Sequence, residues 1–190
     1  MKTLIFFMFI SWLIGATSCS ESTPKPKAYF RIEIPKTKSK LFYYKSLPYS
    51  FAIPQNCILR FDSTDLNSPT LVIAYPRYHA QILCTYEAIN PKTFRKVAEE
   101  SRQFVYRHSV KASAINEKLF EHHEQRVYGM FYDLKGDVAT PCQFSLTDST
   151  HHFFRGALYF DCPPKADSLA PVVTYIKANV LDLMQTFQWR

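Results

Sequence analysis

Glycine is scarce in this chain, with only four residues among 190. That scarcity argues against glycine-rich phosphate-binding loops, which place several glycines in one short segment. Long apolar runs are also missing: the run over residues 4–16 is too short for a membrane-spanning helix, which takes about 20 residues. With 47% apolar and 21% charged residues, the chain has the composition of a globular protein. Its length fits one domain.

The first 18 residues indicate an export signal rather than part of the fold. Met1 and Lys2 precede the apolar run over residues 4–16, which has the length of a signal-peptide core. The small residues GATS then lead into Cys19, an order that resembles the lipobox of bacterial lipoproteins. We expect cleavage before Cys19 and a lipid on its sulfur; a secretory peptide with a chance cysteine is the alternative. Residues 19–28 would then be the lipidated cysteine and a tether, and residues 29–190 one globular domain.

Five cysteines are an odd number, and assigning Cys19 to the lipid leaves an even set. In an oxidising compartment these four could form two disulfides, with three pairings that the sequence cannot choose between. Four buried free thiols are the alternative. The spacing is unlike that of a zinc site, which places cysteines in close pairs. The four remaining residues are Cys57, Cys84, Cys142 and Cys162.

Positive charge is concentrated just after the tether. Residues 25–45 contain seven basic residues and one acidic residue, Glu33. Anionic headgroups attract such a segment by about 1 kcal/mol per residue near the surface. We therefore expect it to lie beside a membrane, or else to be an ordinary solvated stretch. The rest of the domain is nearly neutral, which argues against nucleic-acid binding. The basic residues are Lys25, Lys27, Arg31, Lys36, Lys38, Lys40 and Lys45.

Hydrophobic periodicity predicts an α+β domain, with a mostly antiparallel sheet of about seven strands and two packed amphipathic helices. Apolar residues at helical spacing place the helices at about 91–108 and 168–187. Asn90 is suited to cap the first helix. The segments with strand patterns are residues 29–34, 49–53, 58–61, 70–75, 78–88, 116–121, 125–134, 138–147 and 152–161.

The polar residues do not indicate a catalytic or metal site. The adjacent histidine pairs at 122–123 and 151–152 would point to opposite faces of a strand, so each pair offers one ligand at most to a given site. The segment DSTH at 148–151 holds a carboxylate, hydroxyls and an imidazole, but these residue types also build turns. A catalytic triad normally assembles from distant segments. We expect no enzyme, no metal and no cofactor.

The strand at 152–161 carries a different candidate. Phe153, Arg155 and Tyr159 fall on one face of it, because side chains alternate along a strand. An exposed face of aromatic residues and arginine would be a protein-binding surface. Packing of the same face beneath a helix is the alternative.

Three segments carry distinctive motifs: PKPKAYFRIEIP at residues 24–35, VYGMFY at residues 127–132 and TDSTHHFFRGALYF at residues 147–160. They resemble PKPxxYxRIExP, VYGxFY and TDSxxHFxRGxLYF of the gliding-motility lipoprotein GldD family of Bacteroidetes. The last of the three is the longest match. The resemblance implies a non-catalytic envelope lipoprotein needed for gliding and linked to type IX secretion. Its partners would be a membrane and other gliding and secretion lipoproteins.

The residues after the lipid cysteine indicate in which membrane the anchor lies. Ser20 in place of aspartate favours the outer membrane, by analogy with enterobacterial sorting. Only Glu21 is acidic before Lys25, so the acidic surface-export signal looks absent, and we expect acyl chains such as palmitate in the periplasmic leaflet. Two other functions stay open. One is an envelope module that binds glycan, peptidoglycan or lipid on an aromatic sheet face, and the other is a hydrolase with an unrecognised site.

Overall fold

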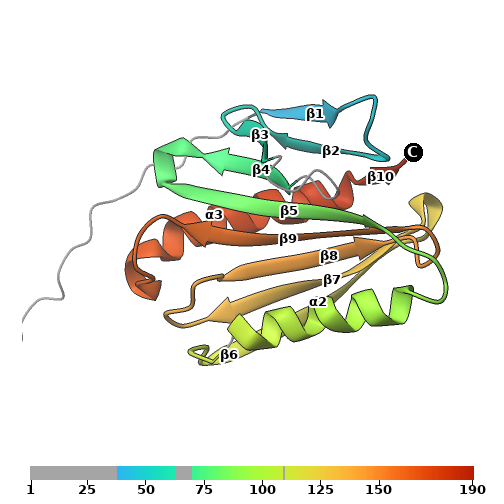
Figure 1. Cartoon of the computed structure of the whole chain (residues 1–190). Coiled ribbons are helices and arrows are strands. Elements are labelled where there is room, and N and C mark those ends of the chain that lie inside the picture. Colours follow the sequence, from blue (N-terminus) through green and yellow to red (C-terminus); the bar gives the residue numbers. More distant parts are fainter. Residues whose placement is uncertain (1–37, 63–69, 109) are drawn as a thin grey trace, which may run out of the picture. The chain divides into compact units, whose positions relative to one another are not determined.

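A seven-stranded antiparallel sheet is the centre of the fold in this computed structural model (Figure 1). The structure describes residues 38–62, 70–108 and 110–190. The strand order is β3-β4-β5-β9-β8-β7-β6, and each strand runs antiparallel to its neighbours. The strands are β3 (Ile58–Asp62), β4 (Thr70–Tyr75), β5 (Ala80–Ala88), β6 (Ala114–His122), β7 (Val127–Lys135), β8 (Cys142–Thr147) and β9 (His152–Phe160).

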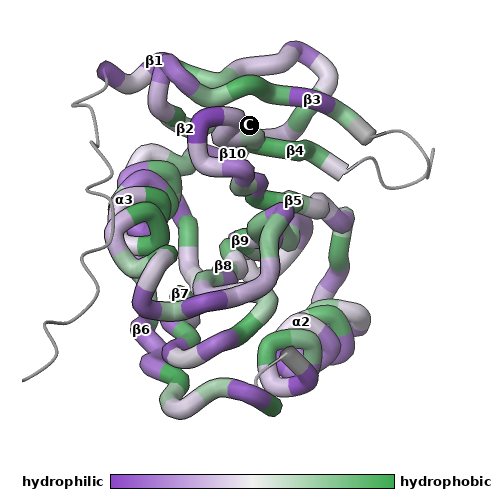
Figure 2. Tube along the Cα trace, turned by 90° about the vertical axis from the view of Figure 1, so that its left-hand side faces the viewer, coloured by the Kyte–Doolittle hydropathy of each residue, from purple (hydrophilic) through white to green (hydrophobic). Residues whose placement is uncertain are grey.

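Two helices cover opposite faces of this sheet (Figure 2). They are α2 (Phe94–His108) and α3 (Ala166–Gln185), close to the helices predicted at 91–108 and 168–187. Asn90 caps the start of α2 as expected, since its Oδ1 accepts the N–H groups of Lys92 at 2.9 Å and Thr93 at 3.1 Å. The predicted α+β architecture is therefore confirmed. In the described part of the chain, no helix has both the length and the apolar character needed to cross a membrane.

A second, three-stranded sheet lies on the α3 side. It consists of β1 (Ser39–Tyr43), β2 (Tyr49–Pro54) and β10 (Gln188–Trp189), in the order β1-β2-β10. Short 3₁₀ turns precede β5 (Pro76–Tyr78) and β7 (His123–Gln125). The sequence patterns did not predict β1 or β10. The predicted strand at 29–34 lies outside the described residues.

The main core lies between α3 and the large sheet. Phe154 and Leu158 of β9 point into it together with Ile176 and Leu183 of α3, and all four are nearly inaccessible to solvent. The alternation predicted for β9 is confirmed, because Phe153 points to the other face and packs with residues of α2.

Gly156 lies in the middle of β9, opposite Phe144 of β8. A Cβ added to Gly156 would lie 2.4 Å from Cε1 of the Phe144 ring and 3.2 Å from Sγ of Cys84. The ring of Phe144 therefore occupies the space that a side chain at residue 156 would need. This explains why glycine stands in the middle of a buried strand, where it is otherwise unfavourable.

Replacing Gly156 with alanine should destabilise the domain by about 1–3 kcal/mol, because the buried Phe144 ring must move to make room. Ser39→Thr, which adds one methyl group at an exposed edge position, should change stability by about 0.5 kcal/mol or less. Denaturant unfolding followed by circular dichroism measures both. Equal stability of the two variants would contradict the packing described for Gly156.

Candidate functional site

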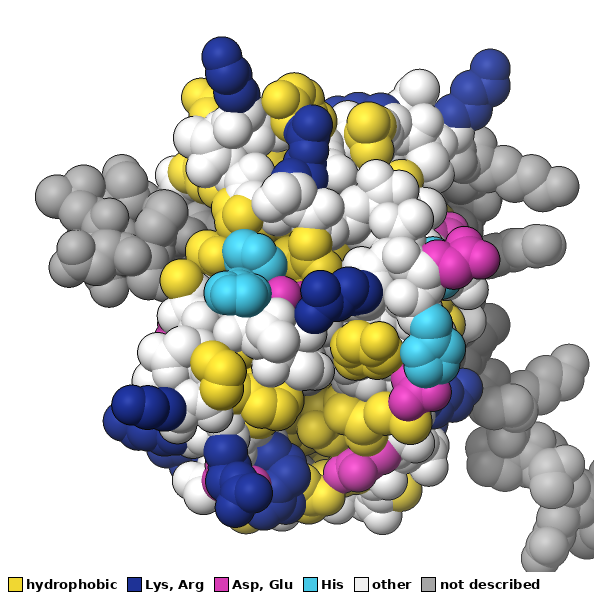
Figure 3. All heavy atoms as spheres, turned by 90° about the vertical axis from the view of Figure 1, so that its right-hand side faces the viewer, with side chains coloured by type: hydrophobic (Ala, Val, Ile, Leu, Met, Phe, Trp, Pro, Cys, Tyr) yellow, Lys and Arg dark blue, Asp and Glu magenta, His cyan; other side chains and the backbone are white. Residues whose placement is uncertain are grey.

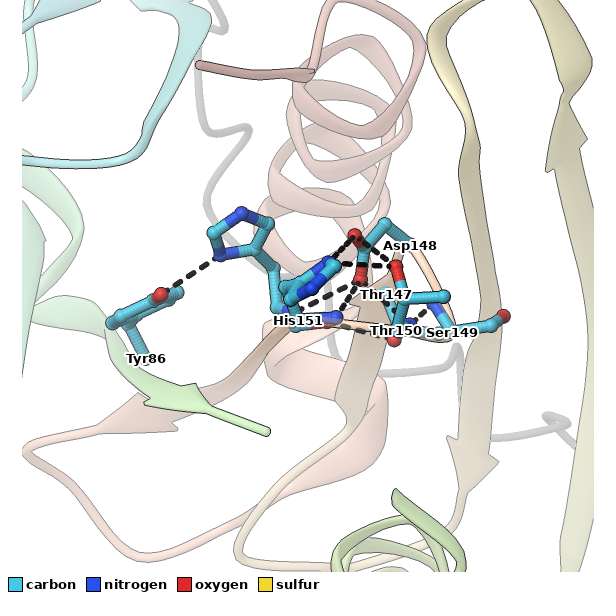
Figure 4. Close-up of polar contacts among 7 residues, drawn as sticks. Tyr86, Thr147, Asp148, Ser149, Thr150 and His151 are labelled. Atoms are coloured by element: carbon cyan, nitrogen blue, oxygen red, sulfur yellow. Dashed lines mark hydrogen bonds and ion pairs between the residues drawn. The ribbon is translucent and has the colours of Figure 1, made fainter. Parts of the chain in front are cut away.

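The turn between β8 and β9 is built around Asp148, which is only 8% exposed (Figure 4). Its Oδ1 accepts the backbone N–H groups of Thr150 at 3.0 Å, His151 at 2.8 Å and His152 at 2.8 Å. Its Oδ2 accepts the hydroxyl of Thr150 at 2.7 Å. The carboxylate is thus committed to the turn, as predicted for this segment, and is not placed to act as a catalytic base.

The protonation of Asp148 follows from the same contacts. Burial alone would raise its pKa, but the hydrogen bonds from the Thr150 hydroxyl and the three backbone N–H groups outweigh burial. They hold the pKa well below its usual range. Ser149 in the same turn has φ 66°, in the left-handed region. The carboxylate therefore stabilises a turn that the backbone would not adopt readily without it.

His152 lies at the edge of an aromatic cluster. Its Nδ1 is 2.8 Å from the hydroxyl oxygen of Tyr86, and its ring stacks on Trp189 at a centroid distance of 5.1 Å. Burial lowers the pKa of His152, so the ring is mainly neutral at pH 7. Over the described ranges, no three His, Cys, Asp or Glu residues come together in an arrangement that could hold a metal ion.

The four cysteines of the domain are free thiols: Cys57, Cys84 and Cys142 are buried, and Cys162 is exposed. Burial raises the pKa of Cys57 to about 11 and that of Cys142 to about 12, which keeps both protonated and unreactive. The disulfides considered from the sequence are absent from this structure. The alternative of buried thiols describes three of the four residues.

Strand register excludes one of the possible disulfides, the one between Cys84 and Cys142. Cys84 lies opposite Gly156 of β9, and Gly156 lies opposite Phe144 of β8. Strand β9 therefore separates Cys84 from Cys142. Because neighbouring strands are about 4.8 Å apart, the two Cα atoms are about 10 Å apart or more. A disulfide needs a Cα separation below about 7 Å.

A cavity of about 180 Å³ lies between α2 and the face of the large sheet. Strands β5 and β9 provide its floor, and the middle of α2 provides one wall. Its polar residues are Thr70, Thr85, Ser101, Tyr132, Gln143, Arg155 and Tyr159, and its apolar ones are Leu83, Phe104, Val105, Phe144, Gly156 and Ala157. The cavity is thus a mixed polar and apolar space beneath a helix.

Among the described residues that line this cavity, Arg155 is the only arginine or lysine. Its Nε donates a hydrogen bond to Oγ1 of Thr85 at 3.0 Å, and its guanidinium carbon lies 5.3 Å from the ring centre of Phe104. The ion pairs among the described residues use other basic side chains. Arg155 is therefore a half-buried positive charge that a hydroxyl and an aromatic ring contact without neutralising it.

The predicted partner surface of Phe153, Arg155 and Tyr159 needs correction. The three residues share a face, as expected, but Phe153 is only 4% exposed because α2 packs over it with Val97. Arg155 and Tyr159 are half-buried and line the cavity. The alternative of packing beneath a helix therefore describes this face better than an open docking surface does.

A larger groove of about 530 Å³ separates α3 from β6 and β7. Its most buried charges already neutralise one another, because Asp133 accepts hydrogen bonds from Lys177 and, at 2.9 Å, from Lys135. Burial would raise the pKa of Asp133, but these lysines outweigh it and lower the pKa. Of these two cavities, the one beneath α2 is therefore the better candidate for ligand binding.

Of the predicted basic residues, the structure describes Lys38, Lys40 and Lys45, and all three are exposed. The other four, and the lipid cysteine Cys19, lie outside the described residues. Lys40 donates to the backbone oxygen of Cys57 at 3.3 Å, so it also supports the turn before β3.

Comparison with known proteins identifies one family, described as "Gliding motility lipoprotein GldD", which matches residues 19–189. No curated protein is similar enough to the chain to count as a match. Among solved structures, the solution structure of cyanobacterial PsbP (CyanoP) from Synechocystis sp. PCC 6803 is similar. Its TM-score is 0.51 at 11% identity, over 83% of this chain and 95% of that one. At this identity the likeness concerns the fold alone.

The contacts of Asp148 predict that the stability of the domain depends on pH. A carboxylate whose pKa is lowered by folding stabilises the domain above the unfolded-state pKa of about 3.9, and this contribution is lost as the pH falls toward the folded-state value. Asp148→Asn should therefore destabilise the domain by about 1–3 kcal/mol at pH 7. The difference from the unmodified protein should shrink at pH 3.

Denaturant unfolding at both pH values measures this effect. Asp161→Asn is the matched control, because Asp161 is exposed. A loss of stability at Asp148 that is the same at pH 7 and pH 3 would show that the charge does not stabilise the turn.

Proposed function

The chain belongs to the family of gliding motility lipoproteins GldD, and from this premise we propose that it is a non-catalytic, lipid-anchored envelope protein that supports gliding motility. The family match over residues 19–189 carries the proposal. It begins at Cys19, the residue that would receive the lipid. In this proposal Cys19 anchors the domain of residues 29–190 through the tether of residues 19–28.

The protein would act through contacts with other gliding and type IX secretion lipoproteins. An exposed aromatic pair near the start of the described chain supports this: Tyr44 is 56% exposed and Phe61 is 42% exposed, and their ring centres lie 5.8 Å apart. Isolated exposed apolar residues are common, but adjacent ones favour an interface. We place the anchor in the periplasmic leaflet of the outer membrane, on the basis of Ser20 and the scarcity of acids before Lys25.

The basic segment would lie close to that membrane. Lys38 and Lys45 flank β1, whose outer side chains Leu41 and Tyr43 are exposed. In the upper part of Figure 3, which corresponds to the level of β1 and β2 in Figure 1, basic side chains project beside hydrophobic ones. Lysine paired with tyrosine and leucine suits a surface of headgroups over acyl chains.

Replacing Cys19 with alanine tests the anchor. The variant should lose its lipid and move from the membrane fraction to the soluble fraction of the envelope, because the acyl chains on Cys19 are the anchor in this proposal. Cell fractionation followed by immunoblotting measures it, with Cys162→Ala as the control. A variant that stays in the membrane fraction at the level of the unmodified protein would overturn the anchoring role of Cys19.

The basic segment makes a separate prediction. In the unlipidated Cys19→Ser protein, Lys38→Gln with Lys45→Gln should weaken binding to phosphatidylglycerol vesicles by about fivefold per charge. Arg95→Gln with Arg107→Gln removes equal charge from exposed positions of α2 and should have little effect. Vesicle sedimentation measures both pairs. Equal losses would mean that net charge alone, rather than this surface, drives binding.

A further inference from the structure

We propose that the cavity beneath α2 binds a carboxylate group carried on a short apolar body, with Arg155 as its counter-ion. This inference concerns a ligand site in the folded domain and does not depend on the lipid anchor. If the domain is an envelope module that binds a ligand, which is the alternative function, Arg155 is the residue that would bind it.

The charge of Arg155 is the first argument. A guanidinium carries five N–H donors, and only Nε has a hydrogen-bond partner among the described residues, the hydroxyl of Thr85 at 3.0 Å. A half-buried charge without a counter-ion is unfavourable, whereas a carboxylate can accept two parallel N–H bonds from the free edge of the guanidinium. The site is therefore positively charged, and its free N–H donors match the geometry of a carboxylate. No described residue supplies that anion.

The surrounding side chains specify the rest of the ligand. Ser101 of α2 and Tyr159 of β9 line the same cavity, and the hydroxyl group of each is able to donate to a carboxylate. Burial raises the pKa of Tyr159, although the charge of Arg155 opposes this shift, so the hydroxyl keeps its proton at pH 7. Leu83 and Val105 provide apolar walls. These walls favour an acid with an aliphatic part over a fully hydrated inorganic anion.

The volume limits the size of the ligand. About 180 Å³ is well above the space that one water needs, and below the 300–1,000 Å³ that is typical of sites for drug-sized molecules. A short aliphatic acid fits this range, and so does the last residue of a peptide with a free carboxyl terminus. These two sources share one chemistry, a single carboxylate next to a small apolar group.

The site also uses the segment that carries the family resemblance. Within residues 147–160, Arg155, Gly156 and Tyr159 line the cavity, and Gly156 also leaves room for the Phe144 ring in the core on the α3 side. Asp148, in the same segment, fixes the turn from which β9 starts. The segment thus builds both the strand and the charged floor of the cavity.

The test compares butyrate with butyramide, which has nearly the same shape but no charge. Calorimetry on the purified full-length lipoprotein in nanodiscs gives the affinities, and the amide NMR signals of Ser101 and Gly156 report where each probe binds. Butyrate should bind saturably and shift the signals of both residues. Butyramide should bind at least about tenfold more weakly than butyrate. This comparison needs no variant, so it stands even if a substitution at Arg155 prevents folding.

Variants then assign the effect. Arg155→Gln should reduce butyrate binding to the level of butyramide, and Arg155→Lys should retain part of the difference because it keeps the charge but not the planar fork. Arg107→Gln, which removes a charge from an exposed position of α2, should leave butyrate binding unchanged. Equal binding of the two probes, no binding of either, or unchanged butyrate binding by Arg155→Gln would each overturn the proposal.

A second pair of probes identifies the source of the carboxylate. Trialanine with a free carboxyl terminus is compared with its amidated form in the same measurement. Binding of the free-acid tripeptide as well as butyrate, with no binding of the amidated tripeptide, supports the proposal with a peptide terminus as the ligand. Selective binding of butyrate alone supports it with a small free acid as the ligand.

Discussion

Three phenylalanine rings hold the two sheets of this domain together. Phe51 comes from β2 of the small sheet, Phe154 from β9 of the large sheet, and Phe187 from the short connection between α3 and β10. Their ring centres lie 5.2–6.0 Å apart, and all three are almost fully buried. Each such pair contributes about 0.5–1.5 kcal/mol beyond the area that it buries. Because Phe187 leads directly into β10, the same packing places Trp189 against His152 and closes the small sheet over α3.

The two sheets differ in how well their strands could be predicted from the sequence. Both helices and the strands of the large sheet have apolar residues at the expected periods, and their existence was predicted correctly. Strand β1 has a single buried residue, Phe42, among exposed neighbours, so it has no amphipathic pattern to detect. Strand β10 has only two residues, Gln188 and Trp189. Both strands form because β2 lies beside them in space, which is a tertiary effect.

The candidate site was predictable in part. Alternation along β9 correctly put Phe153, Arg155 and Tyr159 on one face. It could not show that α2 packs over Phe153 while leaving a cavity at Arg155, because Ser101 and Thr85 come from distant segments of the chain. The cysteines illustrate the same limit. An even number in an exported chain suggested disulfides, but the strand register keeps Cys84 and Cys142 on separate strands with β9 between them.

We propose that this domain acts from a lipid anchor by contacting other proteins of the motility and secretion machinery. Chemical cross-linking in intact cells, followed by purification of the protein in mild detergent and mass spectrometry of the linked peptides, tests it most directly. The account predicts links between the domain and envelope components of gliding or type IX secretion, which should be lost when Cys19 is replaced. Links to none of these components, in cells where the unmodified protein is anchored and abundant, would contradict it.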